Sequence, residues 1–506
     1  MSGSGLALGL VVLGGLTLLR AVTAAGMDLM PQDAYYFLYA ESPALSYHDH
    51  PPLIGYLLWL GKVLFGKSEL AVRAVTLTTA LLLQLGVGWL ALRLFDRESG
   101  GRALALFAAL PMCTVLSLVS SPDLPLLLAW TVALLGLESA LFRGSRRGWL
   151  VAGLGMGLAF LSKYTALFLP AGLVLFLLLS SRHRHRLRSP GPWIALGISQ
   201  LLALPVYLWN LRHGGASVGF QLQERLGALA GFDLDDLLGY LLTQGLSLLP
   251  VPLALMIGWA LRGSWLPRLR ALDGRRLFLW CFFAPLFLTA LALSPFLWVK
   301  LNWPMAAVVA GILLLTPKLS EGRALRIHLA SSGAIHLLIL VQVFLYPVPV
   351  ESDDTWFGWS EIAERVEARH REDPSRFVFS TDSYKTTAEL RFYSDLPEVR
   401  GYDVIDCPAL HLEYVSGDPG ELEGRDALLV ISEDELRPSR RSEAVLERVD
   451  LFFQEVRELP PIVLEHRGRR ARFVRLFAAE GYRGPDAAGA ADRKATGDPC
   501  RFSPTS

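Results

Sequence analysis

Long apolar runs are the feature that most constrains the fold of this chain. Of its 506 residues, 52% are hydrophobic and only 19% are charged. The apolar residues gather in continuous runs rather than in the stripes of amphipathic helices, which is typical of helices that cross a membrane, each needing about 20 apolar residues. The pattern predicts eleven spans, at residues 5–26, 69–93, 103–120, 124–142, 149–162, 165–181, 192–210, 237–261, 277–295, 302–316 and 327–346.

The loops between these runs predict an orientation. Basic residues favour the cytoplasmic side of a membrane. With the N-terminus in the cytoplasm, the inner loops collect Arg97, Arg102, the arginines at 143–147 and the RHRHRLR run at 182–188. The number of spans and this asymmetry together predict that the chain after the last span lies on the outer face.

The composition changes after residue 350 to that of a soluble protein. An amphipathic helix is expected near 358–371, and apolar strands at 377–380, 427–432, 461–465 and 471–477, which together predict a small α/β domain. The fold class is therefore a polytopic α-helical membrane protein with a C-terminal α/β domain on the outer face. The predicted domains are a transmembrane domain at 1–350 with a first outer loop at 27–68, the α/β domain at 351–482, and a disordered tail at 483–506.

Charge and cysteine content exclude some functions. The formal net charge is +1, without the basic excess of a nucleic-acid-binding protein. Cys113 and Cys281 fall inside apolar runs, and Cys407 and Cys500 have neither the spacing of a disulfide framework nor that of metal ligands. We therefore expect neither a nucleic-acid partner nor cysteine chemistry.

The predicted topology gathers polar residues on the outer side. A carboxylate can take a proton from an acceptor hydroxyl, and cations can stabilise a phosphate as it leaves without a metal ion. This combination predicts a site for an anionic, lipid-linked substrate. The residues concerned are Asp28, Asp33, Asp49 and His50 in the first outer loop, Asp123 in SSPD, Lys163 in LSKYT, Arg212 in NLRHGG, and Lys300 and Asn302 in KLNWP.

Each of these residues also has a purely structural interpretation. An aspartate in the first turn caps a helix, which fits Asp33 and Asp123. Asp49 can shape a turn before the two prolines that follow His50. A lysine at a helix end can extend to the membrane surface, as Lys163 and Lys300 would.

Six segments resemble, in the same order, the polyprenyl-phosphate-dependent glycosyltransferases of the GT-C fold, specifically glycosyltransferase family 39 and the ArnT-like aminoarabinose transferases. They cover most of residues 28–305 and read QDAYYFLYA, SYHDHPPLIGYLLWLGKVLFG, SSPDLPLLLAW, LSKYTALFLPAG, NLRHGGASVGFQL and KLNWP. The resemblance implies an inverting, metal-independent enzyme without a cofactor in the inner (plasma) membrane. It would move a sugar from an undecaprenyl-phosphate donor to a lipid, glycan or protein hydroxyl on the periplasmic or outer face.

The chain departs from this family at its acidic pair. The family usually has Asp then Glu before the AYY-like stretch, and this chain has Gln32 and Asp33. Asp33 is the first choice for the general base, and Asp49 is its nearest rival, followed by Asp28.

A second departure concerns the cations. His50 stands where related transferases can carry a lysine. Donor-phosphate contacts would then rest more heavily on Lys163 and Lys300, with His50, Asp123, Arg212 and Asn302 as the other predicted donor-binding residues.

Three other functions stay open at this point. A transporter or flippase of lipid-linked sugars also needs many spans and cations, but transporters place ionisable residues near the bilayer midplane and show repeated halves, which are not seen here. A polymerase or ligase of lipid-linked glycans differs only in using a lipid diphosphate donor. A catalytically inactive scaffold is the third possibility, because of Gln32.

Overall fold

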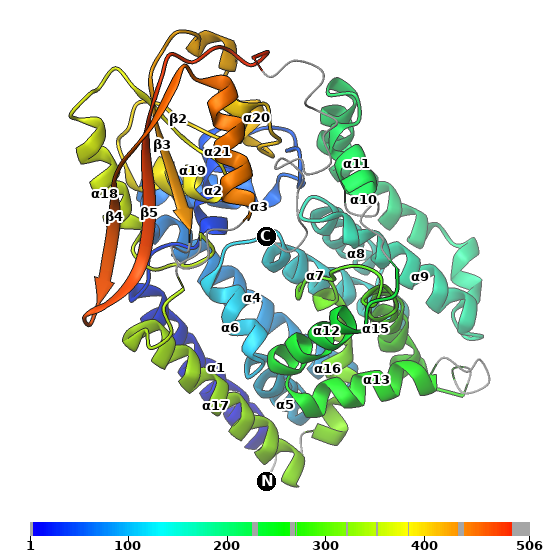
Figure 1. The fold of residues 1–506 in the computed structure, drawn as a ribbon. Helices are drawn as coiled ribbons and strands as arrows, with labels where there is room; N and C mark the ends of the chain where they lie inside the picture. The colour runs from blue at the N-terminus through cyan, green and yellow to red at the C-terminus, as the bar shows by residue number, and fades with distance from the viewer. Residues whose placement is uncertain are drawn as a thin grey trace. The chain divides into compact units, whose positions relative to one another are not determined.

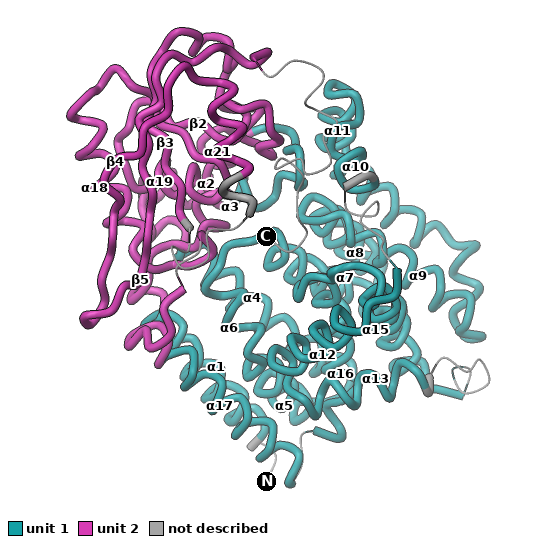
Figure 2. Tube along the Cα trace, in the orientation of Figure 1, with its two compact units in different colours: residues 1–23, 44–57, 73–340 teal, residues 24–43, 58–72, 341–506 magenta. Residues whose placement is uncertain are grey.

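The computed structural model describes residues 4–224, 231–263, 269, 271–319, 322–350, 353–382, 384–433 and 440–487. The chain divides into two compact units, which Figure 2 colours separately. Unit 1 comprises residues 1–23, 44–57 and 73–340, and unit 2 comprises residues 24–43, 58–72 and 341–506. The predicted disordered tail at 483–506 lies outside the described residues from residue 488 onward.

The membrane part of the chain is helical (Figure 1). Each of the eleven predicted apolar runs corresponds to one helix or to two consecutive helices. The elements are α1 (Ser4–Ala25), α3 (Leu53–Phe65), α4 (Glu69–Leu94), α5 (Arg97–Ala108), α6 (Pro111–Leu118), α7 (Asp123–Phe142), α8 (Arg146–Phe160), η1 (Tyr164–Leu167), α9 (Phe168–Leu179), η2 (Arg184–Arg188), α10 (Pro190–Arg212), α11 (Ala216–Gly219), η3 (Phe220–Glu224), α12 (Leu234–Leu248), α13 (Pro250–Gly263), α15 (Gly274–Leu293), α16 (Met305–Leu319) and α17 (Gly322–Leu345).

Fewer helices are long enough to span a membrane than there are apolar runs. Within the described residues, six helices have the length and hydropathy of a span, or up to eight if each bent pair counts as one. The bent pairs are α5 with α6, at 63°, and α12 with α13, at 117°. The runs at 149–162, 165–181 and 302–316 form helices of at most 16 residues, which do not reach across a bilayer by themselves.

Prolines and glycines explain how these helices break and pack. Proline cannot donate a backbone hydrogen bond, so α6 and α13 each begin at a proline, Pro111 and Pro250. Glycines bring α7 and α8 together, because a β-carbon on Gly136 would collide with the backbone of Ala152 on α8. Close packing through small residues is the usual contact between helices in lipid.

Unit 2 contains a five-stranded sheet with the order β2-β1-β3-β5-β4. The strand β1 pairs in parallel with β2 and β3, while β5 runs antiparallel to β3 and β4. The four predicted strands are confirmed, and β2 has only two residues. The elements are α2 (Pro31–Glu41), α18 (Trp359–His370), β1 (Phe377–Ser380), α19 (Lys385–Tyr393), β2 (Val399–Arg400), η4 (Tyr402–Ile405), α20 (Leu412–Val415), η5 (Pro419–Leu422), β3 (Ala427–Glu433), α21 (Arg440–Phe452), β4 (Glu455–His466) and β5 (Arg469–Glu480).

Helices cover both faces of this sheet. Because side chains alternate along a strand, Val378 of β1 packs with Trp359 and Ile362 of the predicted amphipathic helix α18 on one face. On the other face, Phe379 stacks on Phe453, which follows α21. The short helix α2 also belongs to unit 2 and packs against α19.

Candidate active site

The carboxylate of Asp123 is the centre of a buried polar cluster in unit 1. Lys163 Nζ lies 2.7 Å from Asp123 Oδ1, and Asn302 Nδ2 donates to Oδ2 at 2.6 Å. Asp123 is only 2% exposed and Lys163 only 6%. The segments SSPD, LSKYT and KLNWP, far apart in the sequence, therefore meet at one carboxylate.

Local structure explains why these side chains reach this point. Asp123 is in the first turn of α7, and Lys163 is the extended residue between α8 and η1. The turn before Asp123 is held by α4, where Arg73 donates to the carbonyl of Leu118 and Thr76 bonds the hydroxyl of Ser120. The segment that carries Asn302 is held in the same way, because Gln244 of α12 donates to the carbonyl of Leu301 at 2.9 Å.

Asp49 and His50 form a second part of this unit. A turn brings the amide of Tyr47 to the carbonyl of His50 at 3.2 Å, and His50 Nε2 lies 4.0 Å from Asp49 Oδ2. Gln221 donates to the carbonyl of Asp49 at 2.9 Å. The turn is thus a fixed part of unit 1, as the structural interpretation of Asp49 expected, and it presents a buried acid beside an imidazole.

A backbone contact connects this turn with the Asp123 cluster. The amide of Leu53, three residues after His50, donates to the carbonyl of Leu161, two residues before Lys163, at 2.9 Å. The next residue in the chain, Tyr164, hydrogen-bonds Ser217 at 2.6 Å and interacts electrostatically with Asp49. The two polar groups therefore belong to the same region of unit 1.

Asp33 belongs to unit 2, whereas the Asp123 cluster belongs to unit 1. It is fully buried in the first turn of α2, and its Oδ2 accepts a hydrogen bond from the amide of Met30 at 2.9 Å. The capping interpretation is therefore realised in the structure. Gln32 donates to Asp354 at 3.3 Å, and Asp28, the third candidate base, accepts hydrogen bonds from the amide and hydroxyl of Ser360.

Two other predicted donor-binding residues, Arg212 and Lys300, are exposed. Arg212 is the last residue of α10, and Lys300 precedes the Asn302 turn.

Three participants were not predicted from the sequence: Arg73, Tyr164 and Gln221. Arg73 carried a recognisable signal, since an ionisable residue in an apolar helix is usually functional or tightly partnered.

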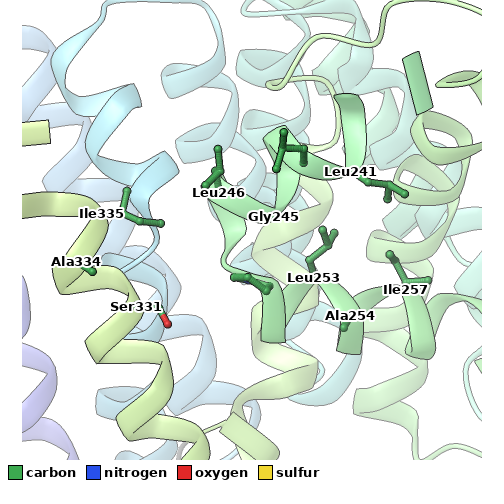
Figure 3. Close-up of a pocket in the computed structure, with 11 residues that line it drawn as sticks. Leu241, Gly245, Leu246, Leu253, Ala254, Ile257, Ser331, Ala334 and Ile335 are labelled. Atoms are coloured by element: carbon green, nitrogen blue, oxygen red, sulfur yellow. The ribbon is translucent and has the colours of Figure 1, made fainter. Parts of the chain in front are cut away.

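An apolar groove runs between α12, α13 and α17 in unit 1 (Figure 3). Its volume is about 590 Å³, and Leu246, Leu253 and Ile335 point into it from the three helices. The groove lies at the 117° break between α12 and α13, where Leu249 has a φ of 68°.

The described residues contain no group of three or more His, Cys, Asp or Glu side chains placed to hold a metal ion. The polar groups brought together in unit 1 are instead a carboxylate bound by an ammonium and an amide, and an acid beside an imidazole. Such groups can bind a phosphate and move a proton.

The chain is similar to several known proteins. Residues 49–209 match the family described as dolichyl-phosphate-mannose-protein mannosyltransferase. The lipid A galacturonosyltransferase RgtD of Rhizobium johnstonii is 27% identical over 396 residues, which are 76% of this chain and 82% of that protein.

Solved structures with the same fold include ArnT from Cupriavidus metallidurans bound to undecaprenyl phosphate, with a TM-score of 0.62, 16% identity, and coverage of 94% of this chain and 98% of ArnT. The archaeal oligosaccharyltransferase AglB from Archaeoglobus fulgidus aligns with a TM-score of 0.50 and 13% identity, over 88% of this chain and 72% of AglB. The fold, the family match and the curated relative agree with one another. The chain is a multi-pass membrane protein and a glycosyltransferase, and it has the GT-C fold that ArnT also shows.

Proposed function

We propose that this enzyme transfers a sugar from a polyprenyl-phosphate donor to a hydroxyl of a lipid acceptor. The observation that carries the proposal is the buried cluster in which Lys163 and Asn302 hold Asp123. The names of the similar proteins support both substrates, since one is a lipid A galacturonosyltransferase and another was solved with undecaprenyl phosphate.

The reaction needs one base and one site for the leaving group. The acceptor oxygen attacks the anomeric carbon and loses its proton to a carboxylate, while the bond between that carbon and the phosphate oxygen breaks. The leaving group departs as polyprenyl phosphate with inversion at the anomeric carbon. Lys163, His50 and Lys300 supply the positive charge that stabilises this phosphate in the proposal.

Two aspartates are proposed for the base, with Asp33 as the first choice. Asp33 is held at the start of α2 by the amide of Met30, directly before the AYY stretch where the resembled family carries its acidic pair. Asp49 is the rival because it belongs to the same unit as Lys163 and lies beside His50. Asp123 is a weaker choice, since Lys163 and Asn302 each occupy one of its oxygens.

The apolar groove offers a place for the prenyl chain of the donor. It is lined almost entirely by hydrocarbon from α12, α13 and α17 (Figure 3). An isoprenoid chain gains nothing from direct contact with water, so a groove of this kind supports a lipid-linked donor rather than a soluble nucleotide sugar.

We further propose that the protein lies in the inner membrane with its site and unit 2 on the periplasmic side. The arginine-rich loops at 143–147 and 182–188 support this orientation, since basic loops stay in the cytoplasm. A second observation supports it: Cys407, in unit 2, is disulfide-bonded, which its spacing in the sequence did not predict. Disulfides form in oxidising compartments such as the periplasm.

The test is sugar transfer by the purified protein in detergent, with EDTA present. Undecaprenyl-phosphate sugars and a membrane lipid extract serve as substrates, and the wild type is compared with Asp33→Asn and Asp49→Asn. We expect release of undecaprenyl phosphate that persists in EDTA and is lost in one of the two variants, which identifies the base. The exposed Arg365→Gln variant in unit 2 serves as the control.

Three outcomes would contradict the proposal. Consumption of a lipid diphosphate sugar but not of the monophosphate would indicate a glycan polymerase or ligase. Full activity in both aspartate variants would exclude both bases. If no donor is consumed and the protein moves these lipids across proteoliposomes, it is a transporter instead.

A further inference from the structure

Unit 2 contains a polar pocket that none of the steps above uses. Its volume is about 690 Å³, and all of its lining residues belong to unit 2. Arg391 of α19, Arg400 of β2 and Ser416 contribute to its wall, together with the segment 394–399. A cavity of this size accommodates a small ligand rather than a single ion.

The lining of this pocket is rich in cations. Five basic and three acidic side chains contribute to it. The basic residues are Lys67, Arg376, Arg391, Arg400 and Arg425, and the acidic residues are Glu41, Asp395 and Glu398.

Arg400 provides the most specific sign of a ligand. It is only 5% exposed, and its Nε and Nη2 both donate to Glu398 Oε1, at 3.0 and 2.8 Å. Its Nη1 is buried and has no hydrogen-bond partner among the described residues. Leaving a buried donor on a charged group unsatisfied is costly, so such an atom usually has a partner from outside the chain.

Arg391 and Lys67 add positive charge to the pocket. Within the described residues, neither side chain forms an ion pair with a carboxylate. Arg391 donates to the carbonyl of Val399 and to the hydroxyl of Ser416, both at 2.8 Å. Lys67 donates to the carbonyl of Arg391 at 2.8 Å. All of these acceptors are neutral, so both positive charges remain available to an anion.

The acidic residues do not cancel this charge. Glu398 is bound on one oxygen by Arg400 and on the other by Arg425, at 2.8 Å, which fixes the two guanidinium groups. Glu41 and Asp395 are exposed, where water and salt screen their charge. Asp403 lies near Arg391 and Arg400, but no ion pair joins it to either arginine in the described part of the chain, and burial raises its pKa in spite of them.

We propose that this pocket binds the phosphate group of a phosphorylated saccharide. Arginine and lysine together suit phosphate, because guanidinium groups bind its oxygens in pairs and an ammonium adds a point charge. The volume left over has room for a sugar ring, and Ser416 and the backbone of 394–399 offer it polar contacts. In this proposal the phosphorylated saccharide is part of the acceptor, and unit 2 recognises it. The inference therefore rests on the proposed function, but the binding can be measured without sugar transfer.

The experiment is isothermal titration of the full-length protein in a non-ionic detergent. The four probes are glucose 1-phosphate, inorganic phosphate, glucose and glucuronate. We expect glucose 1-phosphate to bind more tightly than inorganic phosphate or glucuronate, and glucose not to bind. Its affinity should fall as salt is added, since the contacts are charged.

Two pocket variants and one matched control test the residues. Arg400→Gln should weaken binding of glucose 1-phosphate by about tenfold or more. Arg448→Gln is the control, because Arg448 is also a buried arginine of unit 2, 7% exposed, but does not line the pocket. Arg425→Gln, at a side chain that is 41% exposed, gives a second pocket variant in case Arg400→Gln does not fold, and it should also weaken binding.

Four results would overturn the inference. One is no binding of glucose 1-phosphate to the folded wild type, and another is an equal loss in Arg448→Gln. Equal affinity for inorganic phosphate would remove the saccharide from the proposal, and tighter binding of glucuronate would replace phosphate by carboxylate. None of these depends on activity, so failure here is distinguishable from failure of the proposed transfer reaction.

Discussion

Lys163 and Asp123 form a buried ion pair, with Nζ 2.7 Å from Oδ1, and Asn302 donates to the other oxygen of the same carboxylate. Removing one partner of a buried pair leaves the other charge uncompensated. Lys163→Met should therefore lower the free energy of unfolding by about 3–5 kcal/mol. Adding Asp123→Asn to this variant should recover a large part of the loss, because it removes the stranded charge. Unfolding of the wild type, both single variants and the double variant in detergent measures this coupling, and simple additivity of the two single effects would contradict it.

The turn at Asp49 and His50 predicts that position 50 contacts the leaving phosphate. A lysine carries a positive charge that suits a phosphate, so His50→Lys should keep transfer active. His50→Gln should lower the rate by about tenfold or more, because a charge that would stabilise the leaving phosphate is lost. The control is His185→Gln, in the arginine-rich 182–188 loop. A loss of activity in His50→Lys as large as that in His50→Gln would exclude position 50 from the phosphate site.

The apolar groove predicts discrimination by length of the donor's prenyl chain. Gly245 lines the groove, and a β-carbon there would lie 3.9 Å from Leu253, so an alanine fits and a larger side chain must enter the groove. Gly245→Phe should raise the KM for a long-chain donor by about tenfold or more. It should leave the KM for a two-isoprene donor nearly unchanged. Gly258, on the same pair of helices but without a role in the groove, provides the control as Gly258→Ala. An equal change for both donors would show that the groove does not hold the chain.

Asp382 makes the stability of unit 2 depend on pH. The pKa of Asp382 is raised to about 6, mainly by burial and to a smaller extent by the charge of Asp353. Hydrogen bonds from Thr386 act in the opposite direction. An aspartate in an unfolded chain titrates near about 3.9, so between these two values the folded state binds more protons than the unfolded state. The free energy of unfolding should therefore fall as the pH rises from about 4 to about 6, and then level off.

A substitution tests this dependence. Asn at position 382 keeps the Oδ1 that accepts from the amides of both Tyr384 and Thr386, but it cannot ionise. Asp382→Asn should melt roughly 2–4 °C above the wild type at neutral pH. The difference should shrink toward pH 4. A difference that does not change with pH would show that Asp382 does not carry the effect.

Tyr393 holds the start of the α2 segment within unit 2. Its hydroxyl accepts from the amide of Leu29 at 2.7 Å and donates to Glu69. Tyr393→Phe leaves the buried Leu29 amide without this partner, at a cost of about 1–3 kcal/mol in the free energy of unfolding. Ser360→Ala, which removes one exposed hydrogen bond to Asp28, should cost only about 0.5 kcal/mol. Similar costs for the two variants would contradict the role given to Tyr393.

The sequence predicted those parts of the fold that depend on local pattern. The strands β1 and β3 are short apolar stretches between polar residues, and they lie where they were expected. The two residues of β2 have no pattern of their own and become a strand only by pairing with β1. The proline at Pro250 was visible, but a proline can kink a span or break it, and here α12 and α13 bend by 117°.

In the site, too, the residue types were predictable from local motifs, whereas their contacts were not. Asp123, Lys163 and Asn302 were each named from motifs, but their convergence depends on how α7, α8 and α16 pack, which periodicity does not contain. Gln221 reaches the backbone of Asp49 from η3 and carries no signal in the sequence. Which of the two acids accepts the proton is a question of placement, and sequence order does not answer it.

Unit 2 is formed by segments that are far apart in the chain, and this has a consequence for how the protein is made. The hydrogen bond between Leu29 and Tyr393 joins residues that are 364 positions apart. During translation, the segment that carries Asp33 is made early, and α19 follows only after the apolar helices between them have been synthesised. Until then α2, with its many apolar side chains, lacks its packing against α19. A truncation that removes α19 should therefore disturb the position of Asp33 as well as the carboxyl-terminal sheet. Nascent chains in which α19 has not yet been made are expected to need chaperones.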